Sequence, residues 1–322
     1  MSGPGRFGAV VTAMVTPFGP DGALDLDGAA RLARWLADHG SDALVVAGST
    51  GEATALSDRE KAELWEAVCR SVTVPVIAGA GTADTAHSVE LAARAEQAGA
   101  AAILAVTPYY SRPPQAGLRA HFAAVASATN LPVLLYDIPS RTGRRLAPDT
   151  VLSLACEVAN VVGLKDAAGD VAATARLVAA APPGFEVYSG DDRLTLPLLA
   201  VGARGVVGVA THWAGPEHAE MARAFFAGEV DRARELNCRL LESFEFESTD
   251  EAPNPMPAKA MLRVLGLPAG QCRPPLGPAP ESLDHRARAV LAGLRRAGRE
   301  ARAPASGPPL EVAAGPASPA SG

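Results

Sequence analysis

The sequence predicts an α/β protein whose eight parallel strands alternate with helices and close into a (β/α)8, or TIM, barrel. Eight short Val-rich runs recur through residues 10–210, about 20 to 33 residues apart, and each is followed by a helix-like segment. No Gly-x-Gly-x-x-Gly motif follows the first run and no Walker loop occurs, so the alternative doubly wound sheet lacks a nucleotide-binding motif. Polar residues gather directly after the runs, where the chemistry of such barrels takes place.

The predicted strands are the runs at 10–16, 43–48, 74–79, 101–107, 132–138, 161–165, 186–189 and 205–210. The first helix, over 25–40, places Leu32 and Leu36 on one face and ends in a glycine. Residues 57–60 (Ser-Asp-Arg-Glu) form a capping box, which predicts a helix start ahead of Leu64. Two further helices are expected over 84–98 and 149–158.

Three more helices are predicted after the eighth strand, where they form a small C-terminal helical appendage beside the barrel. Their ranges are 228–246, 257–265 and 281–296, and Pro-rich turns separate them. We therefore predict a catalytic barrel at 1–225, a C-terminal helical region at 226–298 and a tail at 299–322. The Ala, Pro, Gly and Ser composition of the tail predicts disorder, because such a segment buries too little surface to order itself.

The composition argues against several classes of protein. Apolar residues make up 48% of the chain and charged residues 20%, as in ordinary globular proteins. The net charge of −6 argues against a nucleic-acid or anionic-membrane partner. The start of the chain lacks a signal-peptide pattern, no stretch is long enough to span a bilayer, and the four cysteines show no paired spacing, so we expect a cytoplasmic protein with reduced thiols. The six histidines do not cluster, so no metal site is expected.

The sixth predicted strand carries a lysine, Lys165, within the segment 161–169 (Val-Val-Gly-Leu-Lys-Asp-Ala-Ala-Gly). Strand alternation places Lys165 on the same face as Gly163, which is expected to leave open space beside it. A lysine among apolar neighbours tends to lose its charge, and a neutral amine attacks carbonyl groups to form Schiff bases. A lone lysine is more often a strand-end residue whose stem packs and whose ammonium reaches water. The motifs elsewhere in the chain favour the interpretation of Lys165 as a nucleophile.

Two more strand ends carry residues that suit such chemistry. Residues 48–52 (Gly-Ser-Thr-Gly-Glu) bring glycines together with the hydroxyls of Ser49 and Thr50, which can cradle a carboxylate or, alternatively, cap a helix. Tyr136 ends the fifth strand, where its phenol can exchange protons with a carbinolamine or can belong to the core. Arg141, in the loop that follows, offers a planar fork to a carboxylate or is a solvated loop residue.

Residues 107–110 (Thr-Pro-Tyr-Tyr) place two tyrosines at the end of the fourth strand. A loop at the barrel mouth can meet the substrate or a partner subunit, although a pair of half-buried loop aromatics is the simpler alternative. The acids Asp191 and Asp192 follow the seventh strand and are more simply explained as helix caps.

Five motifs in this order, GSTGE, TPYYSRPPQ, LLYDIPSRTG, GLKDAAG and YSGDD, resemble the 4-hydroxy-tetrahydrodipicolinate synthase (dihydrodipicolinate synthase) family of pyruvate-dependent class I aldolases. The resemblance extends from about Phe7 to about Leu294 and excludes the tail. Together the motifs are highly specific, whereas any one of them alone is not.

The resemblance implies a role for each matching catalytic position. Lys165 matches the lysine that forms the Schiff base with pyruvate, and Tyr136 matches the tyrosine that donates and accepts protons. Ser49 occupies a position where most members have a threonine that links two tyrosines in a proton relay, and a serine keeps the hydroxyl. Tyr110 matches the second tyrosine of that relay, which the neighbouring subunit of a dimer contributes.

The resemblance also implies a set of substrate contacts. Thr50 matches the residue that binds the carboxylate of pyruvate, and Arg141 matches the arginine that holds the carboxylate of L-aspartate 4-semialdehyde. Gly190 and Val207 match positions whose backbone groups line the substrate pocket. Asp137 replaces a common asparagine, which puts no catalytic role in doubt.

The implied function is the condensation of pyruvate with L-aspartate 4-semialdehyde, toward diaminopimelate and lysine, in a homotetramer of two dimers and without metal or organic cofactor. The alternative is a related pyruvate aldolase or lyase, either N-acetylneuraminate lyase-like or specific for another keto acid. Ser49 and Thr50 suit the lyase, which usually lacks an arginine at the position of Arg141. A non-catalytic barrel is a third class, against which the lysine, tyrosines and hydroxyls together argue.

Some bacterial members of the family are inhibited by lysine in a pocket at the dimer interface. The corresponding positions here are Asp58, Lys61 and His87, with Tyr109 retained. Lysine carries two ammonium groups, which need anionic partners, whereas His87 supplies no carboxylate and Lys61 adds like-charge repulsion. Asp58 either offsets part of that repulsion or belongs simply to a helix cap. The sequence therefore predicts weak or absent inhibition by lysine.

Overall fold

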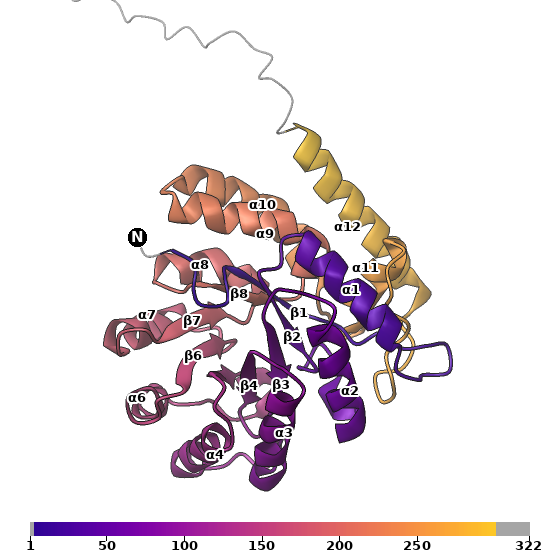
Figure 1. Cartoon of the computed structure of the whole chain (residues 1–322). Helices are drawn as coiled ribbons and strands as arrows, with labels where there is room; N and C mark the ends of the chain where they lie inside the picture. The colour runs from indigo at the N-terminus through magenta and orange to yellow at the C-terminus, as the bar shows by residue number, and fades with distance from the viewer. Residues whose placement is uncertain (1–2, 301–322) are drawn as a thin grey trace, which may run out of the picture.

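The computed structural model describes residues 3–300, and its centre is a closed barrel of eight parallel strands in sequential order (Figure 1). The strands are β1 (Val10–Ala13), β2 (Ala43–Val46), β3 (Val76–Gly79), β4 (Ala102–Val106), β5 (Val133–Asp137), β6 (Val161–Asp166), β7 (Glu186–Ser189) and β8 (Gly205–Gly208). Val11 of β1 lies opposite Val207 of β8, which closes the barrel. The predicted barrel is confirmed, with most strands shorter than the runs that predicted them.

Helices surround the strands, as Figure 1 shows. They are α1 (Leu26–Asp38), α2 (Asp58–Cys69), α3 (Thr85–Gln97), α4 (Gln115–Ser127), α5 (Pro139–Thr142), α6 (Pro148–Glu157), α7 (Val171–Ala180), α8 (Thr195–Ala200) and α9 (Thr211–Phe226), with short 3-10 turns η1 (Ala53–Ala55) and η2 (Asp192–Leu194). The predicted capping box at the start of α2 is confirmed, because the Ser57 backbone N–H donates to the Glu60 carboxylate over 2.8 Å and the Ser57 hydroxyl accepts from the Glu60 N–H. Gly40 follows α1 with a φ of 95°, a conformation that favours glycine.

The strand side chains divide into two packed layers, because successive residues of a strand point to opposite faces. One layer fills the inside of the barrel and includes Val11, Val45, Tyr136, Tyr188 and Val207. The other layer packs outward against the helices, as do Val46 and Leu135. This alternation places Tyr136 and Val207 inside the barrel.

Three further helices follow α9, namely α10 (Val230–Phe246), α11 (Met256–Val264) and α12 (Glu281–Glu300). Helix α10 packs along α9, and α12 packs against α10 and α11 (Figure 1). The predicted C-terminal helices are confirmed, but α12 continues to residue 300 and so includes the first two residues assigned to the tail. The remainder of the predicted tail lies outside the described residues, and the division of the chain at residue 226 stays a prediction.

Residues 3–300 contain neither a helix fit to cross a membrane nor a cluster of metal-ligating side chains. None of the helices there combines the length and the apolar character needed to cross a bilayer. In the same range, no group of three or more His, Cys, Asp or Glu side chains is arranged to hold a metal ion.

Candidate active site

Lys165 lies on β6 between Tyr136 of β5 and Tyr188 of β7. Its side-chain nitrogen Nζ is 4.2 Å from the centroid of the Tyr136 ring, and the residue is only 5% exposed. None of the ion pairs found within residues 3–300 includes Lys165, whereas Lys61 and Lys259 each face a carboxylate. A buried amine with an aromatic neighbour and no carboxylate partner is suited to react with a carbonyl group.

Gly163 does not provide the open space beside Lys165 that the strand pattern predicts. A Cβ at Gly163 would lie 2.4 Å from the backbone carbonyl oxygen of Glu186, so the neighbouring strand β7 fills that side. The room for the lysine comes from Gly190, which follows β7. A Cβ at Gly190 would lie 3.1 Å from both Cγ and Cε of Lys165. The predicted pocket position at Gly190 is therefore next to the lysine stem.

Tyr136 and Val207 belong to the same cluster of side chains inside the barrel. Tyr136 is 4% exposed, and Nζ of Lys165 lies over the face of its ring. Val207, at the end of β8, is buried beside the first strand. The structure thus brings Lys165, Tyr136, Gly190 and Val207 to one end of the barrel.

A cavity of about 390 Å³ opens at this end of the barrel. Its lining includes Ser49 from the turn after β2, Tyr136 from β5 and Arg141 from α5. Tyr109, from the loop after β4, also lines it. A cavity with a phenol, a hydroxyl and a guanidinium group is of a size to hold two small carboxylic acids.

The Gly-Ser-Thr-Gly-Glu turn after β2 is held in a strained backbone conformation. Ala47, which precedes the turn, and Glu52, which ends it, have φ angles of 57° and 55°. These left-handed conformations cost of order 1–3 kcal/mol for residues other than glycine and concentrate at functional sites. The Thr16 hydroxyl donates to the Gly51 carbonyl over 2.6 Å and fixes the turn to the first strand's loop.

Thr50 and Arg141 are linked through a third residue, Asn254, in the loop between α10 and α11. The Asn254 side-chain amide donates to the Thr50 hydroxyl oxygen over 3.0 Å. The Asn254 backbone carbonyl accepts from Nη2 of Arg141 over 3.1 Å. Thr50 is buried and Arg141 is exposed at the cavity. The two predicted carboxylate-binding residues therefore lie on either side of Asn254.

Tyr110 is not brought to the other predicted residues. It is 94% exposed, has a φ of 72° and does not line the cavity, although its neighbour Tyr109 does. The exposed side chain is accessible to another molecule, and its left-handed backbone is a conformation that concentrates at functional sites. The described chain alone does not complete a relay through Tyr110.

The residues at the positions that correspond to the lysine-binding pocket of some relatives lie together in the lining of the cavity of about 390 Å³. Nε2 of His87 is 2.9 Å from both carboxylate oxygens of Asp58, and Nζ of Lys61 is 3.7 Å from Oδ1 of Asp58. Burial lowers the pKa of Lys61, although Asp58 opposes the shift. The single carboxylate of this group is thus already shared between two basic side chains.

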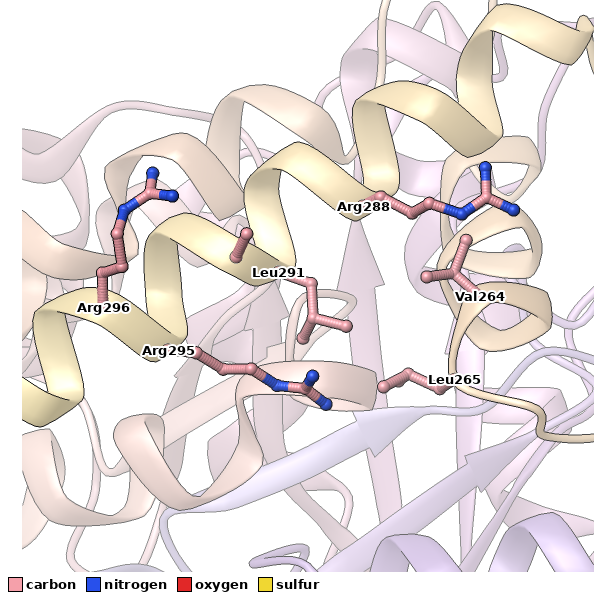
Figure 2. Close-up of a pocket in the computed structure, with 7 residues that line it drawn as sticks. Val264, Leu265, Arg288, Leu291, Arg295 and Arg296 are labelled. Atoms are coloured by element: carbon pink, nitrogen blue, oxygen red, sulfur yellow. The ribbon is translucent and has the colours of Figure 1, made fainter.

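A second cavity, of about 620 Å³, lies between the end of α11 and α12 (Figure 2). Its lining consists of Val264, Leu265, Arg288, Leu291, Ala292, Arg295 and Arg296. Figure 2 shows Arg288 and Arg295 extending from α12 toward α11, whereas Arg296 points away.

This second cavity contains no predicted site residue, whereas Ser49, Tyr136 and Arg141 line the smaller cavity at the barrel end. Lys165 is not itself among the lining residues of that smaller cavity, but it lies beside Tyr136, which is. The smaller cavity is therefore the better candidate for chemistry.

The motifs do not reveal the C-terminal residues that hold the site. The Glu52 carboxylate is 2.6 Å from Nζ of Lys259 and accepts the Arg273 backbone N–H over 2.8 Å. Lys259, Arg273 and Asn254 lie more than 200 residues after the turn that they contact, in segments predicted only as helices and Pro-rich turns. Long-range contacts of this kind leave no local pattern from which to predict them.

Comparisons with known proteins agree with the geometry. The sequence model of the dihydrodipicolinate synthetase family matches residues 6–293. A curated relative from Acidothermus cellulolyticus, named 4-hydroxy-tetrahydrodipicolinate synthase, is 54% identical over 85% of this chain and 88% of its own length. Two dihydrodipicolinate synthases are among the solved structures that are similar to this chain. The dihydrodipicolinate synthase of Cyanidioschyzon merolae with lysine bound is 42% identical, has a TM-score of 0.87, and matches over 90% of this chain and 99% of its own.

The second structure is the chloride-inhibited dihydrodipicolinate synthase of Acinetobacter baumannii complexed with pyruvate. It is 35% identical, has a TM-score of 0.84, and matches over 89% of this chain and 98% of its own. These matches span nearly the whole length of both proteins, and the family model includes all eight strands. This chain belongs to the dihydrodipicolinate synthetase family.

Proposed function

We propose that this chain is a 4-hydroxy-tetrahydrodipicolinate synthase, a lyase that condenses pyruvate with L-aspartate 4-semialdehyde in diaminopimelate and lysine biosynthesis. The observation that supports this most strongly is the position of Lys165, buried against the Tyr136 ring and without a carboxylate partner among the described residues. The relative from Acidothermus cellulolyticus carries the same enzyme name. We further propose that the enzyme acts in the cytoplasm.

The proposed reaction begins with attack of the Lys165 amine on the ketone carbon of pyruvate. The carbinolamine loses water to give an imine, and loss of a methyl proton turns the imine into an enamine. The enamine carbon attacks the aldehyde of the second substrate. The amine of that substrate then attacks the imine carbon, which closes the ring and releases Lys165. Proton transfers to and from these intermediates are assigned to Tyr136, with Ser49 relaying them. None of these steps requires a metal or an organic cofactor.

We propose that four residues bind the two substrates. The Thr50 hydroxyl binds the pyruvate carboxylate, and the Arg141 guanidinium binds the carboxylate of L-aspartate 4-semialdehyde through a bidentate contact. Backbone groups at Gly190 and Val207 line the pocket around the lysine. The location of Arg141 at the cavity of about 390 Å³ supports its assignment to the second substrate.

We propose that Tyr110 completes the proton relay in a second copy of this chain, within a dimer, and that two dimers form a homotetramer. The high exposure and the left-handed backbone of Tyr110 support a role in contact with another molecule. A Tyr110→Phe variant and a Lys165→Ala variant are each expected to be inactive. Mixing them should restore activity in hybrid dimers, since one of the two sites then has both residues. No recovery, with subunit exchange demonstrated, would contradict a shared site.

The competing proposal is a pyruvate aldolase or lyase for a sugar acid or another keto acid. Arg141 separates the two possibilities, because its loss removes a contact worth roughly 1.5–3 kcal/mol only if the second substrate has a carboxylate there. Arg141→Ala should therefore raise the KM for L-aspartate 4-semialdehyde roughly 10- to 150-fold and leave pyruvate binding intact. Normal turnover of the semialdehyde by this variant would favour the lyase.

The decisive experiment is reduction with borohydride in the presence of pyruvate, followed by peptide mass spectrometry. The chain contains only three lysines, Lys61, Lys165 and Lys259, so the position of a trapped pyruvyl group is unambiguous. The proposal requires the adduct on Lys165 and no adduct in Lys165→Ala. A coupled assay with a panel of aldehydes then identifies the second substrate. An adduct on another lysine, or none, would exclude the proposed mechanism.

A further inference from the structure

A single residue of the loop between α10 and α11, Asn254, contacts both predicted carboxylate-binding residues. The Asn254 amide nitrogen donates to the Thr50 hydroxyl oxygen over 3.0 Å, and the Asn254 carbonyl accepts from the Arg141 guanidinium over 3.1 Å. Thr50 follows β2 and Arg141 lies on α5 after β5, so the residues come from separate parts of the barrel. None of the five motifs includes Asn254.

The position of Asn254 is itself well fixed. Its backbone N–H donates to the Ser248 hydroxyl over 3.2 Å. Farther along the chain, Lys259 is 2.6 Å from the Glu52 carboxylate, and Glu52 also accepts the Arg273 N–H. Glu52 belongs to the same turn as Thr50. The chain around Asn254 and the turn that carries Thr50 are therefore joined by contacts beyond this residue pair.

The direction of the two hydrogen bonds matters for the chemistry. A threonine hydroxyl has one hydrogen to donate and two lone pairs to accept with. The Asn254 amide occupies a lone pair of Thr50, which leaves the hydroxyl hydrogen to be donated elsewhere, as a carboxylate requires. The Asn254 carbonyl occupies one of the five N–H groups of Arg141 and leaves the others for a second carboxylate.

The side-chain oxygen Oδ1 of Asn254 is buried and has no hydrogen-bond partner within the described residues. A buried acceptor without a partner lowers stability, so most buried polar groups are paired. Among the described residues, the only hydrogen bond of this side chain is therefore the one from its amide nitrogen to Thr50.

We propose that Asn254 is a positioning residue. Its side chain orients the Thr50 hydroxyl toward the pyruvate carboxylate, and its backbone carbonyl orients Arg141 toward the carboxylate of the second substrate. This role rests on the proposed function, and it extends the site from the barrel to the C-terminal helical region. The side chain serves pyruvate alone, because substitutions at position 254 keep the backbone carbonyl.

The test compares Asn254→Ala with Asn254→Asp by the pyruvate concentration that gives half-maximal borohydride trapping. Asn254→Ala removes the donor and should raise that concentration about tenfold. Asn254→Asp has nearly the same shape but accepts the hydroxyl hydrogen and adds a negative charge, so it should raise the concentration further. The KM for L-aspartate 4-semialdehyde should change less than threefold in both. If Asn254 had a purely structural role, Asn254→Ala would raise the half-maximal pyruvate concentration more than Asn254→Asp, because the aspartate keeps the shape of the side chain.

A double-mutant cycle with Thr50→Val tests whether Asn254 acts through Thr50. With Thr50→Val already present, Asn254→Ala should leave the half-maximal pyruvate concentration within about twofold. The proposal would be overturned if the two substitutions raised the half-maximal pyruvate concentration independently of each other. It would also be overturned if Asn254→Ala alone left that concentration at the wild-type value. Thermal unfolding of each variant identifies any that fail to fold, and the cycle can then be run with Asn254→Ser. If wild-type protein forms no adduct on Lys165, the proposed function fails instead.

Discussion

Lys165 and Lys259 are buried in similar ways but in different regions of the molecule. Each has Nζ 4.2 Å from an aromatic ring centroid, that of Tyr136 for Lys165 and that of Phe18 for Lys259. Lys259 also pairs with Glu52 over 2.6 Å and donates to the Gln271 carbonyl over 3.0 Å. Lys165 has no ion pair within residues 3–300. Burial is therefore common to both, and the presence of a carboxylate partner distinguishes them.

Because only Lys259 has a carboxylate partner among the described residues, we expect the two lysines to have different roles. At the junction of the barrel and the C-terminal helices, the charge of Lys259 is compensated and joins two segments of the chain. At the barrel end, the amine of Lys165 has no compensating carboxylate and is available to a ligand. Substitution of each lysine tests this distinction between a structural role for Lys259 and a reactive role for Lys165.

The largest expected effect is the loss of activity on replacing Lys165. Lys165→Met should lower kcat by more than about a thousandfold, because removal of the covalent nucleophile removes the reaction path. Its free energy of unfolding should be unchanged or slightly higher, since an apolar side chain of similar volume replaces a buried amine without a partner. Steady-state kinetics and urea unfolding measure the two effects. Activity within tenfold of wild type would contradict the distinction.

Replacing Lys259 should have the converse effect. Lys259→Met leaves the Glu52 carboxylate buried without its cation, which should lower the free energy of unfolding by about 3–5 kcal/mol. Borohydride trapping of pyruvate on Lys165 should persist in the folded fraction. The control is the double variant Glu52→Gln with Lys259→Met, which removes both charges and should recover most of the stability. Equal loss of unfolding free energy in the single and double variants would show that the unpaired Glu52 charge is not the cause of the destabilisation.

Asp137 extends the comparison to carboxylates, since Glu52 has a cation and Asp137 has no ion pair within the described chain. Burial raises the pKa of Asp137 from its usual 3.8 to about 6, against a hydrogen bond from the Leu146 N–H. The folded state thus binds the proton more tightly than the unfolded chain, and ionisation destabilises the fold as pH rises from about 4 through 6. Asp137→Asn should stabilise the protein by about 2–3 kcal/mol at pH 8. Thermal unfolding at pH 8 and pH 4 checks this, since the gain should vanish at the lower pH.

Lys61 is the third lysine and lies between the two extremes, 3.7 Å from Asp58 at the cavity. Its positive charge should keep lysine from binding there, so we expect little inhibition of turnover by lysine in the low millimolar range at saturating pyruvate. The double variant Lys61→His with His87→Glu should become more sensitive, because it removes a cation and adds an anion. Strong inhibition of the wild type at low lysine concentration would mean that Lys61 does not oppose the ligand.

The sequence allows the barrel, and the position of the candidate residues at the ends of its strands, to be predicted because the signals for both are local. The Ser57–Glu60 capping box needs only four residues, and the ends of neighbouring strands place Tyr136 beside Lys165 without knowledge of the helices. The order of the motifs, together with the family resemblance, supplies the roles of the remaining residues.

The parts that the sequence does not predict depend on contacts between distant segments. Gly163 fits against the backbone of β7 rather than leaving space, because strand alternation specifies a face but not what packs on it. Asn254 lies 204 residues from Thr50 and 113 residues from Arg141, and no spacing rule links positions so far apart. The residues that orient the site from outside the motifs therefore emerge only from the fold.

The attachment of the Gly-Ser-Thr-Gly-Glu turn to the C-terminal region has a consequence for how the protein is made. Arg273 and Glu52 are 221 residues apart, so a ribosome that adds about 5–20 residues per second needs roughly 11–44 s to supply the second partner after the first. During that interval β3 to β8 are added, but the turn still lacks its contacts with Asn254, Lys259 and Arg273. A growing chain therefore contains Lys165 well before the segments that hold the turn after β2. The contacts of this turn are complete only after residue 273 has been added.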